Sequence, residues 1–346
     1  MRVIFVLLAL AYESIMRCRN YLYDRGLLPS YTSSLPVISI GNVTAGGNGK
    51  TPLCMLIVRE LFERGYKPIV LSRGYGGTEV GPHVVAASDE PGRVGDEPLL
   101  MVRQGVPVVV CRKRAVGARF IEQMGNFNVI VLDDGLQHRA LKRDVEIASI
   151  FVGSRDAIDQ FVAGKLLPLG LFRENRDQAL RRVHAVVLNY RSIESQNTNS
   201  HDVQAVRDVL PERIVVYTSS LIEPKLVWLD TGESLEPCEI GVFTAIANPR
   251  GVVQSLEAMG CVVRETREFS DHYVFSEEEI REMLDSNPSL PFVCTEKDAV
   301  KISRFSPELR QRLAVLSVRA KVEPAGEFMS HIEGAIATKL EALHGS

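Results

Sequence analysis

The stretch Ile40-Gly41-Asn42-Val43-Thr44-Ala45-Gly46-Gly47-Asn48-Gly49-Lys50-Thr51-Pro52 decides the fold of this chain. It follows an apolar run over 35–40 that predicts a buried strand. It leads into residues 53–64, whose apolar positions recur with helical spacing. A glycine-rich turn between a strand and a helix presents backbone N–H groups to an anion. The sequence therefore predicts a nucleotide-binding phosphate loop.

The stretch fits the pattern G-x-x-x-x-G-K-[ST] except at Thr44, where the pattern has glycine. We expect Lys50 to reach the β- and γ-phosphates of ATP and the Thr51 hydroxyl to bind Mg²⁺. A flexible loop with a solvated lysine is the competing interpretation, and the order of strand, glycines and helix disfavours it. The residues expected to cradle the phosphates are Thr44, Ala45, Gly46, Gly47, Asn48 and Gly49.

Length and composition describe an ordinary globular protein with room for two domains. The chain has 346 residues, 45% of them hydrophobic and 24% charged, with a net charge of −3, which gives no general attraction to nucleic acid. The cysteines form no CxxC pair, so buried free thiols in a reducing cytoplasm are expected. They lie at Cys18, Cys54, Cys111, Cys238, Cys261 and Cys294.

Strand and helix patterns alternate after the loop, which predicts an α/β fold with a mainly parallel sheet and helices on both faces. We expect residues 1–223 to form a phosphate-loop domain, 224–237 a hairpin-like linker and 238–346 a smaller α/β domain that closes over the site. Residues 192–201 read as a surface loop. The expected strands are 68–72, 106–111, 128–132, 145–152, 183–189, 240–244, 261–264, 291–295 and 315–318, and the helices are 113–124, 250–259, 276–285, 307–314 and 328–343.

Acidic residues stand where ligands bind in such sheets, at the carboxyl ends of strands. Asp133 and Asp134 follow the apolar run 129–132, the usual place for a Mg²⁺ partner in a phosphate-loop protein, although a polar turn is the alternative. Asp96 and Glu97 precede a helical pattern, where an N-cap with a first-turn acid is an equally good interpretation. Both acidic pairs are candidates for the site.

The N-terminus carries an apolar run from Val3 to Tyr12, too short to span a bilayer, which needs about 20 residues. A signal peptide is the alternative that a cytoplasmic ATP site disfavours. An interfacial helix fits better, with Arg17, Arg19 and Arg25 meeting lipid phosphates. A helix packed on the core is the other interpretation, and the two can coexist.

Several motifs together resemble the tetraacyldisaccharide 4′-kinase family, the lipid A kinases of Gram-negative bacteria. They occur in family order from about residue 40 to about 300, and threonine at 44 is also the family's habit. This chain departs from the family at Tyr273, where a second histidine is usual, and over 169–175. The motifs are 41–52, Leu71-Ser72-Arg73-Gly74-Tyr75-Gly76-Gly77, Val94-Gly95-Asp96-Glu97-Pro98, Asp133-Asp134-Gly135-Leu136-Gln137-His138, Leu166-Leu167-Pro168, Arg173-Glu174, Asp271-His272 and Thr295-Glu296-Lys297-Asp298-Ala299-Val300.

The resemblance implies transfer of the γ-phosphate of ATP, with Mg²⁺, to the 4′-hydroxyl of an acylated glucosamine disaccharide 1-phosphate, giving lipid IVA. It implies a peripheral enzyme at the cytoplasmic face of the inner membrane, and the sequence points to no obligate protein partner. Asp96 is the candidate base, paired with His272 from the second domain. The candidate metal ligands are Thr51, Asp133, Glu97 and Glu174, and the candidate substrate contacts are Asn42, Arg73, Tyr75, Asp134, Gln137 and His138.

Two other functions remain open on the sequence. A soluble phosphate-loop ATPase or switch protein would share the loop and Asp133, and it would need neither Asp96 nor the apolar N-terminus. A membrane-peripheral binding protein with a decayed loop would lack ATP binding, and the intact Lys50, Thr51 and Asp133 speak against it.

Overall fold

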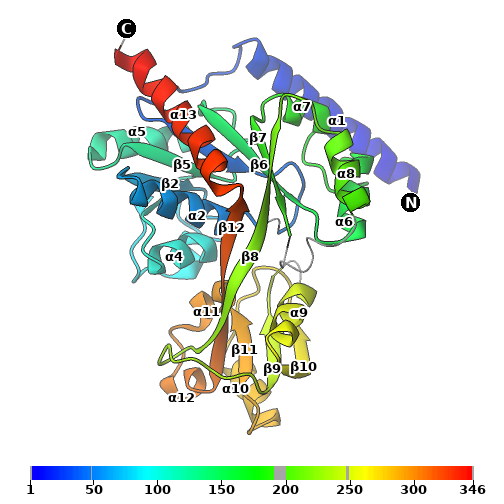
Figure 1. Ribbon diagram of the computed structural model, residues 1–346, viewed down its shortest axis with the longest axis vertical. Helices are drawn as coiled ribbons and strands as arrows, with labels where there is room; N and C mark the ends of the chain where they lie inside the picture. The colour runs from blue at the N-terminus through cyan, green and yellow to red at the C-terminus, as the bar shows by residue number, and fades with distance from the viewer. Residues whose placement is uncertain (1, 48, 191–199, 247–248, 345–346) are drawn as a thin grey trace.

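The computed structural model describes residues 2–47, 49–190, 200–246 and 249–344. In these residues twelve strands form one sheet, in the order β10-β9-β11-β12-β8-β7-β6-β1-β5-β2-β4-β3. Figure 1 shows two lobes of unequal size along this sheet. We call the part from α1 to α8 the first lobe and the part from β9 to α12 the second lobe. The expected α/β class with a mainly parallel, open sheet and a second, smaller α/β part is confirmed.

The first lobe follows from strongly apolar strands that pair in parallel and are buried on both faces. Alternate residues of β5 enter different cores: Val131 packs in the cluster that contains α2, while Ile130 and Leu132 pack with α5 on the other face. Among the strands that the structure describes in this lobe, only β3 runs antiparallel to its neighbour. The strands are β1 (Val37–Gly41), β2 (Pro68–Ser72), β3 (His83–Val84), β4 (Val108–Val110), β5 (Val129–Asp133), β6 (Val145–Phe151) and β7 (Ala185–Asn189).

The helices of the first lobe cover both faces of its sheet (Figure 1). Residues 192–199 of the expected 192–201 loop lie outside the described residues, and a helix begins at Ser200. The helices are α1 (Arg2–Asp24), α2 (Lys50–Glu63), α3 (Pro91–Val94), α4 (Asp96–Arg103), α5 (Arg114–Met124), α6 (Arg155–Ala163), α7 (Arg176–Leu180) and α8 (Ser200–Asp208).

The second lobe repeats the parallel strand–helix pattern on a smaller scale. A capping box in which Ser276 and Glu279 bond to each other's backbone N–H groups fixes the start of α10. The expected helix 307–314 is wrong in its extent, because the helix ends at Arg310 and the chain then enters a strand. The elements are β9 (Glu239–Thr244), α9 (Arg250–Ala258), β10 (Val262–Glu268), α10 (Glu277–Ser286), β11 (Phe292–Thr295), α11 (Glu296–Ile302) and α12 (Pro307–Arg310).

Two long antiparallel strands, β8 (Val215–Trp228) and β12 (Leu313–Glu323), run through both lobes and join them (Figure 1). A single bridge between Val227 and Ser234 marks the expected hairpin at 226–237. The last helix, α13 (Ala325–His344), returns to the first lobe, where Phe328 and Ile332 pack in the same core as α2. The division into independent domains at 224–237 stays a prediction, and the structure adds that α13 packs with the first lobe.

Candidate active site

The phosphate loop leaves β1 and enters α2 at the carboxyl edge of the sheet. Gly41 has no room for a side chain, because a Cβ would lie 2.5 Å from Cβ of Leu136 in the loop after β5. Gly49 has a φ of 71°, a left-handed conformation that glycine adopts without strain, and α2 begins at the next residue. Lys50 Nζ lies 3.4 Å from Oδ1 of Asp134. Asn48, one of the expected phosphate contacts, lies outside the described residues.

A cavity of about 970 Å³ opens between the loop, the strand ends and the second lobe. Three helices, α2, α4 and α11, begin at its wall, and residues of their first turns line it: Lys50 and Thr51, Glu97, and Lys297. Helix N-termini carry a partial positive charge that favours anions. The cavity therefore suits a polyanionic ligand such as a nucleotide.

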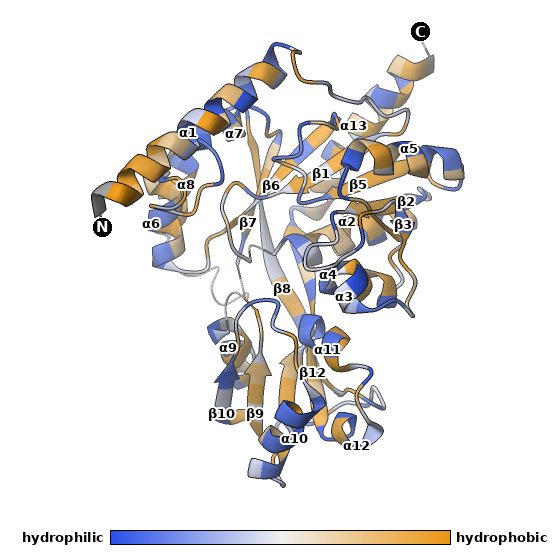
Figure 2. Ribbon diagram, turned by 180° about the vertical axis from the view of Figure 1, so that it is seen from behind, coloured by the Kyte–Doolittle hydropathy of each residue, from blue (hydrophilic) through white to orange (hydrophobic). Residues whose placement is uncertain are grey.

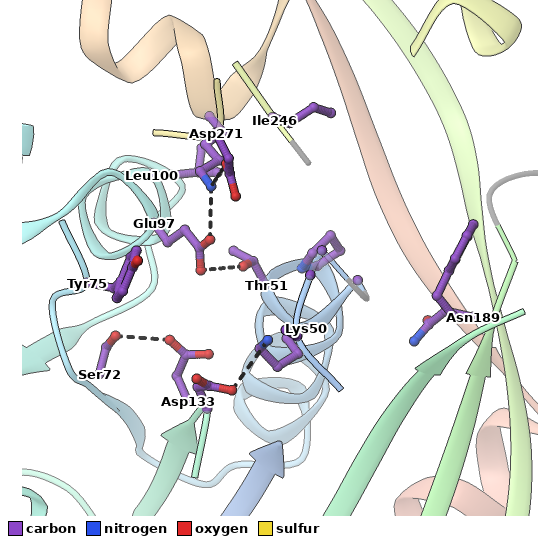
Figure 3. Close-up of a pocket in the computed structure, with 18 of the residues that line it drawn as sticks. Lys50, Thr51, Ser72, Tyr75, Glu97, Leu100, Asp133, Asn189, Ile246 and Asp271 are labelled. Atoms are coloured by element: carbon purple, nitrogen blue, oxygen red, sulfur yellow. Dashed lines mark hydrogen bonds and ion pairs between the residues drawn. The ribbon is translucent and has the colours of Figure 1, made fainter. Parts of the chain in front are cut away.

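Thr51, Glu97 and Asp133 face the same space (Figure 3). The Thr51 hydroxyl donates to Oε2 of Glu97 at 2.9 Å, and Ser72 Oγ donates to Oδ2 of Asp133 at 2.9 Å. Oδ1 of Asp133 is buried and has no hydrogen-bond partner. Burial, together with the charges of Glu97 and Asp134, raises the pKa of Asp133 to about 6.

These observations fit a divalent cation. Mg²⁺ is bound through one or two carboxylates, and the remaining ligands are water and substrate phosphates. A cation would give the unpartnered Oδ1 of Asp133 a ligand and would relieve the repulsion from Glu97. Thr51, Asp133 and Glu97 are therefore the residues that would hold it.

Asp96 and His272 meet across the two lobes, the pairing that the family resemblance implied. His272 Nδ1 lies 3.0 Å from Oδ2 of Asp96, although 176 positions separate the two residues. The ring of Tyr75 lies against that of His272, with 4.9 Å between centroids. His272 has a φ of 63°, rare for a residue with a side chain, so its backbone is held by its surroundings. The pair is already assembled in this structure.

Lys297 brings a positive charge to the same point. Its Nζ lies 3.2 Å from Asp271 Oδ1, 3.3 Å from Glu97 Oε1 and 3.3 Å from His272 Nε2. Burial alone would raise the pKa of Asp96, but the hydrogen bond from His272 and the charge of Lys297 hold it below its ordinary value. The hydrogen bond with Asp96 raises the pKa of His272. Asp96 is thus a buried, ionised carboxylate held next to His272 and Lys297, which line the cavity.

The expected substrate contacts divide into two groups. Arg73, Tyr75, Asp134, Gln137 and His138 line the cavity. Asn42 is instead buried, and its amide donates to the carbonyl of Gly46 at 3.4 Å, so it shapes the loop.

Glu174 lies apart from the other three metal candidates. It is fully buried, accepts two hydrogen bonds of 2.8 Å from Arg182 and one of 2.9 Å from Asn20 in α1, and does not line the cavity. Its carboxylate is thus engaged in joining α1 to the body. This placement gives no support to the expectation that Glu174 binds metal.

The sequence assigned no site role to Lys297, Ser72 or Arg114, although Ser72 and Lys297 stand inside the motifs quoted above. Arg114 is buried below the loop after β5 and donates to the carbonyl of Asp133 at 3.2 Å. Arg19, expected to face lipid, instead donates to the carbonyl of Gln137 at 2.6 Å and lines the cavity. A lysine two residues after a strand end was the signal that could have found Lys297.

Known proteins resemble this chain over nearly its whole length. A family model described as tetraacyldisaccharide-1-P 4′-kinase matches residues 1–337. Proteins named tetraacyldisaccharide 4′-kinase are 35% identical over 302 residues in Aeromonas hydrophila (86% of this chain, 83% of that protein) and 34% identical over 344 residues in Shewanella amazonensis (98% and 94%). The crystal structure of LpxK from Aquifex aeolicus in complex with ATP superposes with a TM-score of 0.73 at 26% identity, covering 97% of this chain and 99% of that one. The chain therefore belongs to the tetraacyldisaccharide-1-P 4′-kinase family.

Proposed function

We propose that this chain transfers the γ-phosphate of ATP to the 4′-hydroxyl of a tetraacylated glucosamine disaccharide 1-phosphate, giving lipid IVA. One observation carries the proposal: a single cavity collects Lys50, Thr51 and Asp133 from the first lobe beside the Asp96–His272 pair that spans both lobes. Phosphoryl transfer needs a phosphate cradle, a cation and a group that takes the acceptor's proton. The relative from Aquifex aeolicus, described in complex with ATP, supports the nucleotide.

The residues have distinct tasks in this reaction. Lys50 neutralises charge on the transferring phosphate, and bound Mg²⁺ would supply further charge neutralisation at Thr51, Asp133 and Glu97. Asp96 accepts the proton of the attacking hydroxyl, and His272 orients the carboxylate through the 3.0 Å hydrogen bond. Lys297 and Tyr75 flank His272: Lys297 Nζ lies 3.3 Å from its Nε2, and the Tyr75 ring lies against its ring.

An acylated acceptor resides in a membrane, and α1 offers a surface for it. From Tyr12 onward α1 is tied to the body, since the Tyr12 hydroxyl donates to the carbonyl of Arg173 at 2.6 Å. The first half exposes an apolar set that extends from the body (Figure 2): Ile4, Phe5, Leu7, Leu8 and Leu10. Among the described residues, no helix combines the length and apolarity needed to cross a bilayer. We propose that α1 lies in the surface of the inner membrane, on its cytoplasmic face.

The decisive experiment incubates the purified chain with γ-labelled ATP and the disaccharide 1-phosphate in detergent, and it looks for label in lipid. Lys50→Ala should lower the rate about 10²–10³-fold, the cost of losing one contact to developing charge. Lys321→Ala is the matched control, because Lys321 is half-exposed and pairs with Glu323 away from the cavity. Slow ATP hydrolysis that ignores the lipid acceptor would favour the switch-protein alternative.

A further inference from the structure

A fully buried carboxylate stands behind the site without touching the cavity. Asp298, in the first turn of α11, is 0% exposed. Its Oδ2 accepts hydrogen bonds of 2.8 Å from both Thr244 Oγ1 and Thr295 Oγ1. The backbone N–H of Ala245 also donates to it, at 3.3 Å. Asp298 therefore fixes the carboxyl end of β9 to the start of α11.

Asp298 is bound to Lys301, and Lys301 reaches across the lobe interface. Lys301 Nζ lies 3.1 Å from Asp298 Oδ1 and 3.8 Å from Oδ2 of Asp96, and its side chain is only 7% exposed. Its ammonium group also lies 5.4 Å from the ring centroid of Phe275. A lysine enclosed in this way has one geometry, so it holds the second lobe at a set distance from Asp96.

The same carboxylate controls the backbone that carries His272. The carbonyl of Ala245, whose N–H is bound by Asp298, accepts a hydrogen bond of 3.3 Å from the N–H of His272. His272 needs such support because its φ of 63° is unfavourable by itself. One buried ion pair thus contacts Asp96 on one side and, through Ala245, His272 on the other.

We propose that the Asp298–Lys301 ion pair positions Asp96 and His272 against each other across the lobe interface. Both are positioning residues: neither lines the cavity, and each acts through a group that does the chemistry. The inference rests on the function proposed above for Asp96 and His272. It adds to that site two buried residues of the second lobe, Asp298 and Lys301, which lie behind the residues that act on the substrates.

The test is a double-mutant cycle on turnover. Lys301→Met should lower kcat about 10²-fold, because a displacement of about 1 Å at a reacting group has that cost, and leave KM for ATP within about twofold. Lys301→Arg, which keeps the charge, should restore most of the rate. In a His272→Ala background, Lys301→Met should cost less than about threefold, because groups that act as a unit are not additive. The control Lys321→Met should leave kcat unchanged in the wild-type and in the His272→Ala background.

A second readout needs no turnover. In protein with ¹⁵N-labelled histidine, Lys301→Met should shift the ring Nδ1 resonance of His272, which the His272→Ala variant identifies. If Lys301→Met does not fold, Asp298→Asn combined with Lys301→Met leaves no lone buried charge and is judged by the same criteria. A fully multiplicative loss in the His272→Ala background, or an unchanged His272 resonance, overturns the proposal. Failure of the wild-type chain to phosphorylate the disaccharide would refute the proposed function, and the resonance would still test the positioning.

Discussion

At the scale of one residue, the buried carboxylate of Asp133 destabilises the ligand-free chain, and a bound cation would remove that destabilisation. Its folded-state pKa of about 6 lies above the ordinary 3.8, so ionising this carboxyl group costs more in the folded chain than in the unfolded one. This cost to the stability of the folded chain is absent below about pH 4 and complete above about pH 6. Asp133→Asn should therefore raise the stability of the ligand-free chain at pH 8 by about 1–3 kcal/mol. The same variant should need about tenfold more Mg²⁺ for half-maximal rate. Thermal unfolding and a Mg²⁺ titration measure the two effects, and an unchanged titration would make Asp133 structural.

His138 makes a second residue-scale prediction, on acid stability. Burial, reinforced by Arg114 and Arg73, lowers the pKa of His138 to about 4 from 6.5. Between about pH 6.5 and 4 the unfolded chain binds a proton at this ring more readily than the folded chain does. The free energy of unfolding is therefore highest above about pH 6.5 and decreases as the pH falls towards 4. Because the ring is only partly buried, we expect a discounted effect of about 1–2 kcal/mol. His138→Gln should flatten urea-unfolding stability between pH 7 and pH 5, and an equally steep decline in the variant would contradict this.

At the scale of an element, α1 has two halves with different environments. From Tyr12 onward it is bonded to the body through Tyr12, Arg19 and Asn20, while the part before Tyr12 exposes leucine and isoleucine side chains. The expected interfacial and core interpretations of this helix thus each have structural support, in different halves. Membrane binding itself stays a proposal.

The matching prediction replaces the exposed face and leaves the anchored half intact. The variant carries four substitutions: Ile4→Gln, Leu7→Gln, Leu8→Gln and Leu10→Gln. In flotation with anionic liposomes, it should move from the floating lipid fraction to the soluble fraction. Interfacial binding scales with buried apolar area, so this loss should be large. KM for the acylated acceptor should rise more than KM for ATP. Val274→Gln is the control, since Val274 is 81% exposed in the second lobe, and equal flotation of all three proteins would refute the anchor.

At the scale of the whole molecule, each lobe contributes one residue of the catalytic pair: Asp96 comes from the first lobe and His272 from the second. Asp96→Asn and His272→Ala should each lower kcat by about 10²–10⁴-fold, the usual range for proton transfer by a positioned side chain. The double variant should be little worse than the worse single one, because the two groups act through one hydrogen bond. Steady-state rates with both substrates saturating measure this, and fully multiplicative losses would indicate two separate roles.

The elements near the loop were predictable from the sequence because their signals are local. Apolar runs with glycine between them predict β1, β2 and β5, and the helical spacing after Lys50 predicts α2, all of which the structure contains. The placement of Asp133 at a strand end followed from the same runs. Extents were predicted less well: a helix expected over 307–314 ends at Arg310, since pairing with β8 draws the following residues into β12.

By itself, the sequence determined the phosphate loop, the parallel sheet and the residue types of the site, because glycine, apolar strands and carboxylates act through neighbouring backbone. Only the tertiary structure decided which distant side chains meet. It placed Lys297 and Lys301 beside Asp96, put Glu174 against Arg182 instead of the cavity, and returned α13 to the first lobe. The two lysine contacts cross the lobes, which the long pair β8 and β12 joins. Pairing between strands almost a hundred residues apart is a property of the folded chain that no local pattern encodes.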